Sequence, residues 1–192
     1  GEWVLRHACR QAKAWQALCQ APLQMAVNVS IRQFMDPTLL TVIKEALNDS
    51  GLEPQYLTLE MTENMLMENA HSNIEALQRI KELGVKISID DFGTGYSSLS
   101  YLKQFPLDEL KIDRSFVCEV QSETDKAPII DAIIAMARSL GLSIVAEGVE
   151  NDAQLEFLRR RGCDVIQGFL FSQPVTIDKF GNLLSGAGFS NK

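Results

Sequence analysis

Two patterns of hydrophobic and polar positions alternate along the chain. Short apolar runs, typical of buried strands, are separated by segments in which apolar residues return every three or four positions, as on one face of a helix. Strands that alternate with helices in this way are typical of crossover units, which build a parallel sheet. The pattern predicts six strands, at residues 25–29, 57–61, 85–90, 109–113, 143–147 and 164–167.

The helices predicted between these strands are marked by capping and helix-breaking residues. Asp36 as N-cap and Pro37 at the first helical position predict the start of a helix that Gly51 ends. The other helices are expected at about residues 3–18, 69–83, 99–104, 128–140, 152–161 and 177–184. These elements predict an α/β fold whose parallel strands form either a TIM-like (β/α) barrel or an open sheet, with residues 1–192 forming one domain.

The number of strands indicates that this barrel is incomplete. A closed barrel of the type has about eight strands. The pattern predicts six, and the chain opens on a helix that no strand precedes. We therefore expect the first strand and its helix to be missing at the N-terminus, with further sequence upstream.

Composition and charge narrow the classes of partner. A net charge of −7 argues against a nucleic acid polymer, although divalent cations allow an acidic protein to bind a small phosphate ligand. No apolar run approaches the roughly 20 residues that span a bilayer, so we expect no membrane contact by this domain. The cysteines at positions 9, 19, 118 and 163 lack zinc-ligand spacing and are typical of thiols in a reducing, cytoplasmic compartment.

Polar side chains end five of the predicted strands. They are Asn28, Glu60, Asp90, Lys111 and Glu147. An unpaired charge is costly in a core, but the carboxyl rim of a parallel barrel or sheet is where such folds carry their chemistry. Each residue taken singly is better explained as structural, whereas five strand ends that agree favour a metal-dependent site that cleaves phosphodiesters.

The adjacent carboxylates Asp90 and Asp91 are the sharpest local signal. At a strand end they point to different sides, so one of them can bridge two cations that lie about 3.5–4 Å apart, as in two-metal hydrolases. The alternative is an Asp N-cap beside a solvated neighbour. The loop that follows, Phe92-Gly93-Thr94-Gly95, is flexible enough to approach a ligand closely.

Lys111 and Asn28 extend this hypothesis. Asn28 offers a neutral oxygen suited to a hard cation such as Mg²⁺ or Mn²⁺. Lys111 alternates with apolar neighbours and is expected to point inward among the carboxylates. There it is either a structural counter-ion or a catalytic group that orients water and stabilises transition-state charge.

Several longer motifs resemble one known family. VNVSIRQF, LEMTEN, IDDFGTGYSSLSYLKQFPLDELKIDRSFV, VAEGVEN and QGFLFSQP, between Trp3 and about Pro174, are similar to EAL domains, phosphodiesterases that hydrolyse cyclic di-GMP. The resemblance implies a barrel of the EAL type and a two-metal site with Mg²⁺ or Mn²⁺. Asn28, Glu60 and Asp90 would bind one ion, and Asp90, Asp91 and Glu147 the other.

The resemblance also implies roles for the remaining site residues. Lys111 and Glu147 would be catalytic, with Lys111 in contact with the attacking water, and Gln167 and Asp91 would contact substrate. Glu63 would act with the catalytic residues by bracing the DFGTGYSS loop, which couples metal binding, substrate and dimerisation. Glu150 would lie just behind the ligands.

The family further implies the product, linear pGpG, and the partners. We expect a homodimer or self-association, with GGDEF or sensory domains elsewhere in a parent protein that other domains could anchor to a membrane. The glutamate of the family's Glu-Ala-Leu strand, a ligand of the first metal, would lie upstream of residue 1, so we expect this chain to be impaired. The alternative is a catalytically inactive receptor for cyclic di-GMP, whose expected signature is loss of metal ligands.

Overall fold

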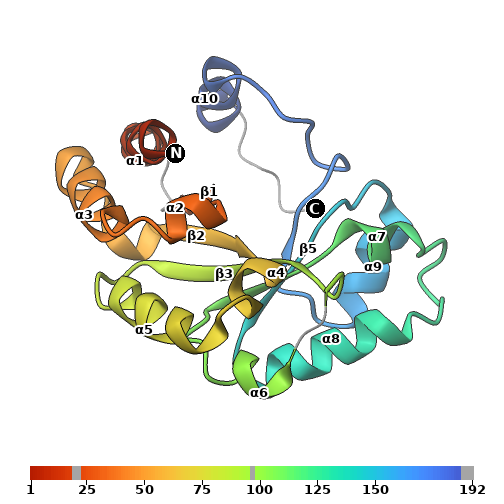
Figure 1. Cartoon of the computed structure of the whole chain (residues 1–192). Helices are drawn as coiled ribbons and strands as arrows, with labels where there is room; N and C mark the ends of the chain where they lie inside the picture. The colour runs from red at the N-terminus through yellow and green to blue at the C-terminus, as the bar shows by residue number, and fades with distance from the viewer. Residues whose placement is uncertain (19–22, 96–97, 187–192) are drawn as a thin grey trace. The chain divides into compact units, whose positions relative to one another are not determined.

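The computed structural model describes residues 1–18, 23–95 and 98–186. Its strands form one sheet in chain order: β1 (Met25–Asn28), β2 (Leu57–Thr62), β3 (Lys86–Phe92), β4 (Glu109–Ile112), β5 (Ser143–Ala146) and β6 (Val165–Ile166). The pairings of β3 with β4, β4 with β5 and β5 with β6 are parallel (Figure 1). The predicted α/β fold built from crossover units is therefore confirmed.

Helices occupy most of the connections. They are α1 (Glu2–Gln16), α2 (Ile31–Phe34), α3 (Leu39–Ser50), α4 (Glu63–Met67), α5 (Ala70–Lys81), α6 (Leu99–Leu102), α7 (Arg114–Cys118), α8 (Pro128–Ser139), α9 (Asp152–Arg160) and α10 (Ile177–Gly186), with a 3₁₀ turn at Pro54–Tyr56. Within the described ranges, no helix combines the length and hydrophobicity that crossing a bilayer requires.

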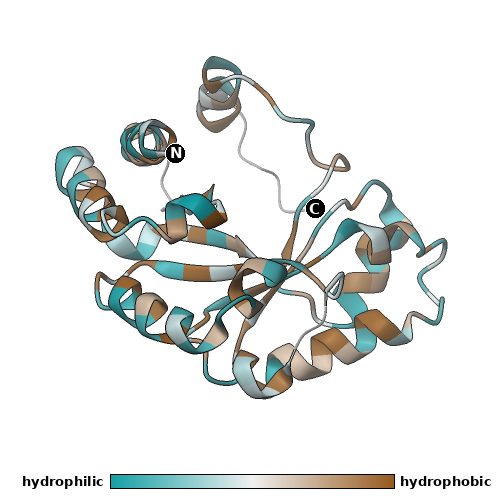
Figure 2. Cartoon of the chain, in the orientation of Figure 1, coloured by the Kyte–Doolittle hydropathy of each residue, from teal (hydrophilic) through white to brown (hydrophobic). Residues whose placement is uncertain are grey.

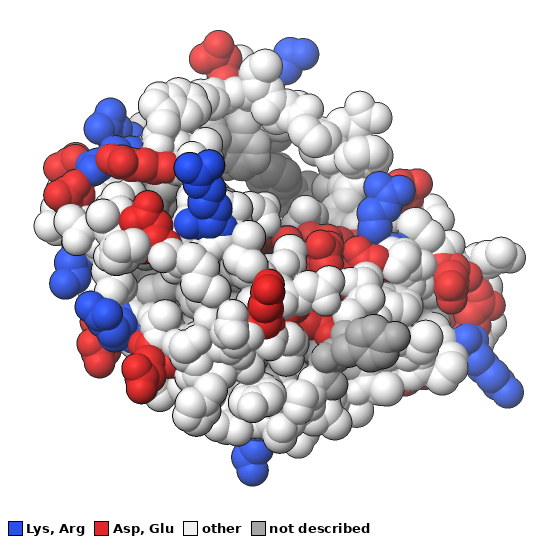
Figure 3. Space-filling model, in the orientation of Figure 1, with Lys and Arg blue, Asp and Glu red and all other residues white. Residues whose placement is uncertain are grey.

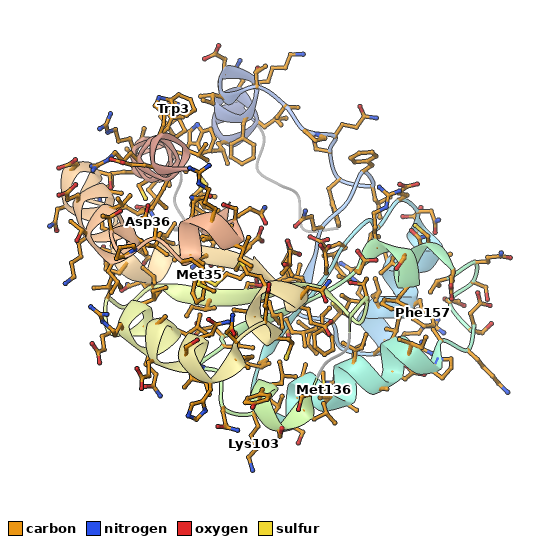
Figure 4. The ribbon with its side chains drawn as sticks, in the orientation of Figure 1. Trp3, Met35, Asp36, Lys103, Met136 and Phe157 are labelled. Atoms are coloured by element: carbon orange, nitrogen blue, oxygen red, sulfur yellow. The ribbon has the colours of Figure 1, made fainter. Side chains whose placement is uncertain are left out.

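The chain divides into two compact units. The first contains residues 1–59, 82–86 and 174–192, as far as these are described. In it α1 packs on α3 and β1, and Figure 1 shows α1 beside α3. The buried face of α1 is Leu5, Cys9 and Ala12, while Trp3 on its outer side (Figure 4) is 71% exposed.

The second unit contains residues 60–81 and 87–173, and with them β3 to β6. Both faces of β4 are covered, because Leu110, Lys111 and Ile112 are all buried. Helix α8 packs on β4 and β5 through apolar residues such as Ile130 and Ile134, and Figure 2 shows the hydrophobic bands along α8. A sheet buried on both faces reads as short apolar runs, which is why the sequence pattern located its strands.

One predicted helix start is wrong. The helix expected to begin at Pro37 with Asp36 as N-cap begins at Leu39, and Thr38 is its N-cap residue. Asp36 Oδ1 instead accepts hydrogen bonds from Thr38 N at 2.8 Å and Thr38 Oγ1 at 2.6 Å, so it closes the preceding turn. Gly51, with φ of +66°, ends the helix as predicted.

Candidate metal centre

Four charged side chains from four different strand ends meet in the second unit. Lys111 Nζ, at the end of β4, lies 2.8 Å from Glu60 Oε1, 3.1 Å from Asp90 Oδ1 and 2.6 Å from Glu147 Oε1. These side chains are only 4–17% exposed. The prediction that these strand-end residues converge is confirmed for these four.

The parallel register explains the convergence. Ile89 pairs with Leu110, so Asp90 and Lys111 lie at neighbouring positions of β3 and β4. Lys111 pairs with Val145, and the Glu147 amide donates to the Ile112 carbonyl at 3.1 Å just beyond β5. Parallel strands in register bring their carboxyl ends to one edge, and their polar side chains meet there.

The electrostatics of the cluster leave Lys111 charged. Burial works against the ammonium, but the carboxylates of Glu147 and Glu60 and the nearby charge of Asp90 raise the pKa of Lys111 overall. Burial raises the pKa of Glu147, and Lys111 offsets part of that rise. A lysine held in this state acts as a cation and not as a proton acceptor.

Asp91 adds a further carboxylate to the cluster, beside Asp90 and Glu147. Its φ of +54° is in the left-handed region, and the pairing of β3 with β4 is irregular between Ile89 and Phe92. The Asp91 amide donates to Asp90 Oδ1 at 3.1 Å. Burial and the charges of Asp90 and Asp113 raise the pKa of Asp91. A bulged, left-handed strand end of this kind is costly and is typical of functional sites.

The donor set fits divalent cations. Carboxylate oxygens of Asp90, Asp91 and Glu147 lie within 4.8 Å of one another. With Glu60 the cluster has four carboxylates and one lysine, so it keeps an excess of negative charge that a hard cation would neutralise. Figure 3 shows acidic side chains gathered at the centre of this face.

Glu63 lies behind the same strand end. Its side chain is 1% exposed, and its Oε2 accepts a hydrogen bond from the Gly93 amide at 2.8 Å. A Cβ on Gly95 would come within 3.0 Å of Glu63 Oε1. The carboxylate therefore contacts the described part of the DFGTGYSS loop, while Tyr96 and Ser97 lie outside the described residues.

Other predicted site residues are held mainly by their backbones. The Gln167 backbone amide donates to Ala146 O at 2.8 Å and its carbonyl accepts from Val149 N at 3.1 Å. The residue is exposed. The exposed Glu150 donates its amide to Gln154 Oε1 at 2.8 Å. Asn28 ends β1 in the first unit, so its place in the site stays a prediction.

One residue of the site was not predicted from the sequence. Asp113 caps α7, where its Oδ1 accepts from Ser115 N at 2.9 Å, and it interacts with Asp91. The Asp-x-Ser spacing was the available signal, since such pairs form caps and turns. The sequence also holds Glu-Ala-Leu triplets at residues 45–47 and 75–77, but both lie within helices, α3 and α5, and neither ends a strand.

Comparisons with known proteins agree on one family. The model of the EAL domain matches residues 1–174. MucR of Pseudomonas aeruginosa, a bifunctional diguanylate cyclase/cyclic di-GMP phosphodiesterase, is 49% identical over 179 residues, which cover 93% of this chain and 26% of MucR. NbdA of the same species, a cyclic di-GMP phosphodiesterase, is 46% identical over 176 residues, which cover 92% of this chain and 22% of NbdA. The chain thus spans about a quarter of these relatives.

Solved structures give the same result for the fold. The PaMucR phosphodiesterase in its c-di-GMP complex superposes with a TM-score of 0.89 at 48% identity, over 94% of this chain and 73% of that one. The EAL domain of DcpA from Mycobacterium smegmatis gives a TM-score of 0.88 at 38% identity, over 96% of this chain and 83% of that one. The predicted barrel architecture is therefore confirmed.

Proposed function

The chain belongs to the EAL domain family, and we propose that it is the phosphodiesterase domain of a protein that hydrolyses cyclic di-GMP to linear pGpG. The observation that carries the proposal is the cluster around Lys111, where three carboxylates from three strands converge within 3.1 Å of one ammonium. A purely structural site would need one counter-ion for the lysine. The additional carboxylates, including Asp91, are accounted for by cations.

We propose two ions, Mg²⁺ or Mn²⁺, which when bound supply an activated water and neutralise charge on the phosphate. Asn28, Glu60 and Asp90 would hold one ion, and Asp90, Asp91 and Glu147 the other. The acidic oxygens at this rim favour hard cations over the softer metals that sulfur and imidazole select. The proximity of Asp90, Asp91 and Glu147 supports the second of these sites.

The chain's own residues would divide the remaining work. Lys111, charged and fixed by its ion pairs, would contact the attacking water and stabilise negative charge that develops at phosphorus. Glu147 would act beside it. Gln167 and Asp91 would contact substrate, and Glu63 would hold the loop that begins at Gly93, through the hydrogen bond to its amide.

The wider setting belongs to the same proposal. Residues 1–192 would form one EAL domain that self-associates or dimerises, in a cytoplasmic protein with GGDEF or sensory domains. MucR, named as both cyclase and phosphodiesterase, supports such a multidomain parent. A catalytically inactive receptor is the other function for this family, but the retained carboxylates and Lys111 favour the enzyme.

One experiment separates these functions. The full-length parent is incubated with cyclic di-GMP in Mn²⁺, in Mg²⁺ and in EDTA, and pGpG is followed by chromatography, while binding is measured in Ca²⁺. Turnover with Mn²⁺ or Mg²⁺ that EDTA abolishes is the expected result. Binding without turnover would identify a receptor and contradict the proposed activity.

A further inference from the structure

The short helix α7 packs against the turns that follow two of the site's strands. A Cβ on Gly148, directly after Glu147, would lie 2.6 Å from Arg114 Cβ and 3.4 Å from Arg114 Cα. A Cβ on Gly93, two residues after Asp91, would lie 2.8 Å from Phe116 Cε2 and 3.1 Å from Phe116 Cζ. Any side chain larger than a hydrogen atom would clash at these two positions. Residues of α7 therefore pack directly against the glycine backbone of both turns.

The contact at Gly93 bears on the geometry of the acidic cluster. Gly93 has φ of +98°, and its amide points to the buried Glu63 carboxylate. The Phe116 ring lies where a side chain on Gly93 would be, beside Ile133 Cδ1, which is 3.4 Å from the same position. Gly93 is therefore held between a hydrogen bond to Glu63 and the edge of an aromatic ring.

Asp91 depends on this turn for its own conformation. It is left-handed at φ of +54°, a conformation that costs a non-glycine residue energy unless its surroundings impose it. The Thr94 amide and hydroxyl both donate to the Asp91 carbonyl, at 3.4 and 2.8 Å, and close the turn that Gly93 sits in. Moving Gly93 would release the backbone that holds Asp91 near Asp90 and Glu147.

We propose that Phe116 is a positioning residue for the metal centre, with its ring edge on Gly93 fixing the turn at residues 91–95. The importance of Phe116 for catalysis rests on the proposed function. The contact between Phe116 and Gly93, and its effect on the turn, are independent of that function. Phe116 also borders a cavity of about 330 Å³ that Val120, Pro128 and Ile130 help to line. Phe116 is half-buried, so truncating its ring enlarges an existing cavity and should lower the melting temperature only slightly. The main expected effect is greater motion of the turn at residues 91–95.

Amide hydrogen exchange in EDTA tests the proposal on the 192-residue chain. Phe116→Ala should speed exchange of the Gly93 amide at least 10-fold, and Phe116→Leu, which keeps part of the contact, should speed it less. Phe157→Leu is the matched control, since Phe157 (Figure 4) is a fully buried aromatic residue of α9 that stacks under Arg161. The control should lower the melting temperature and leave Gly93 exchange within twofold of the wild-type value.

Metal binding gives a second readout. Phe116→Ala should weaken Mn²⁺ binding at least fivefold in calorimetric titration, while Phe157→Leu should not. Unchanged Gly93 exchange in both Phe116 variants, or equal acceleration in the control, would overturn the positioning role. A wild-type parent that fails to hydrolyse cyclic di-GMP would instead contradict the proposed function and leave the exchange result standing.

Discussion

At the residue scale the site is defined by an excess of carboxylates over the single lysine among them. Lys111 neutralises only part of the charge of Glu60, Asp90 and Glu147, and Asp91 adds to the excess. Burying unpaired carboxylates is costly, so such a cluster is stable only if cations, water or protons compensate it. Individual side chains therefore carry sharply different consequences when they are changed.

Asp90→Asn in the full-length parent should abolish hydrolysis while the domain stays folded. An amide cannot supply the second anionic oxygen that bridges two cations, and Lys111 keeps Glu60 and Glu147 as partners. We expect a loss of at least about 100-fold, since changing groups that only orient metal ligands already costs about 10–100-fold. Turnover is measured in Mn²⁺ and the fold by circular dichroism.

Asp108→Asn is the matched control for this change. Asp108 forms an ion pair with Lys81, with 2.7 Å between Lys81 Nζ and Asp108 Oδ2, and it also accepts a hydrogen bond from the Ile87 amide. Neither partner belongs to the Lys111 cluster. The control should lower the melting temperature and retain turnover within about threefold of the parent, because a surface-type ion pair contributes about 1 kcal/mol or less. Full activity of Asp90→Asn would show that the two-metal assignment is wrong.

The described cysteines should differ strongly in reactivity. Burial raises the pKa of Cys9 to about 11, and burial is also the main reason that the pKa of Cys163 is raised to about 11. At pH 8 roughly a thousandth of each thiol is ionised, and reactivity rises with pH until the thiol ionises near pH 11. Cys118 is exposed, and Cys19 lies outside the described residues.

Brief treatment of the native chain with iodoacetamide at pH 8 should therefore label Cys118 well before Cys9 or Cys163. Peptide mass spectrometry reads the order directly, and the unfolded chain in guanidinium is the control in which all three react. Equal labelling of Cys9 and Cys118 in the native state would contradict the burial of Cys9 on the inner face of α1.

At the scale of elements, glycines at strand and helix ends decide how closely the helices approach the site. Gly148 and Gly141 have nearly the same φ, +70° and +72°, but their surroundings differ. A Cβ on Gly148 would meet Arg114, whereas a Cβ on Gly141 would meet nothing within 4 Å. A substitution at Gly141 therefore tests backbone strain alone, whereas a substitution at Gly148 tests backbone strain together with close packing.

Gly141→Ala should cost about 1–2 kcal/mol of unfolding free energy, because only the left-handed conformation opposes it. Gly148→Ala should cost about 1–3 kcal/mol more, since the added methyl group overpacks against α7. Urea unfolding of both variants measures the difference. Gly148→Ala should also weaken Mn²⁺ binding, because it displaces the neighbouring Glu147. Equal losses of unfolding free energy in the two variants would show that α7 moves aside without cost.

At the scale of the whole molecule, metal binding should be coupled to stability. A ligand that binds only the folded state stabilises it by about 2.7 kcal/mol at a hundredfold excess over its Kd. For a chain of this length that raises the melting temperature by roughly 5–10 °C. Mn²⁺ should produce this shift and EDTA should reverse it, as measured by differential scanning fluorimetry.

Asp90→Asn is the control for the metal effect. It should reduce the Mn²⁺-dependent shift to less than half of the wild-type value, because Asp90 is the residue proposed to bind both ions. A shift of the same size in wild type and variant would mean that Mn²⁺ binds elsewhere on this acidic chain, whose net charge is −7.

The α/β architecture and the four charged residues that converge in the structure were predicted from the sequence. Strands buried on both faces, such as the one that contains Leu110 and Ile112, read as short apolar runs, and a polar residue that interrupts or ends such a run is conspicuous. Glu60, Asp90, Lys111 and Glu147 were visible for that reason. Gly51 marked a helix end because few other residues adopt its left-handed conformation.

The contacts among these residues, and the side chains packed behind them, depend on the tertiary structure. Helix α7 spans only five residues, which is too short to show a helical period, so its contacts with Gly93 and Gly148 could not be predicted from the pattern. The three-way pairing of Lys111 depends on strand register, and the contact of Phe116 with Gly93 joins residues 23 positions apart. Contacts of this kind arise from how elements pack, and a hydrophobic pattern records burial but not which neighbour provides it.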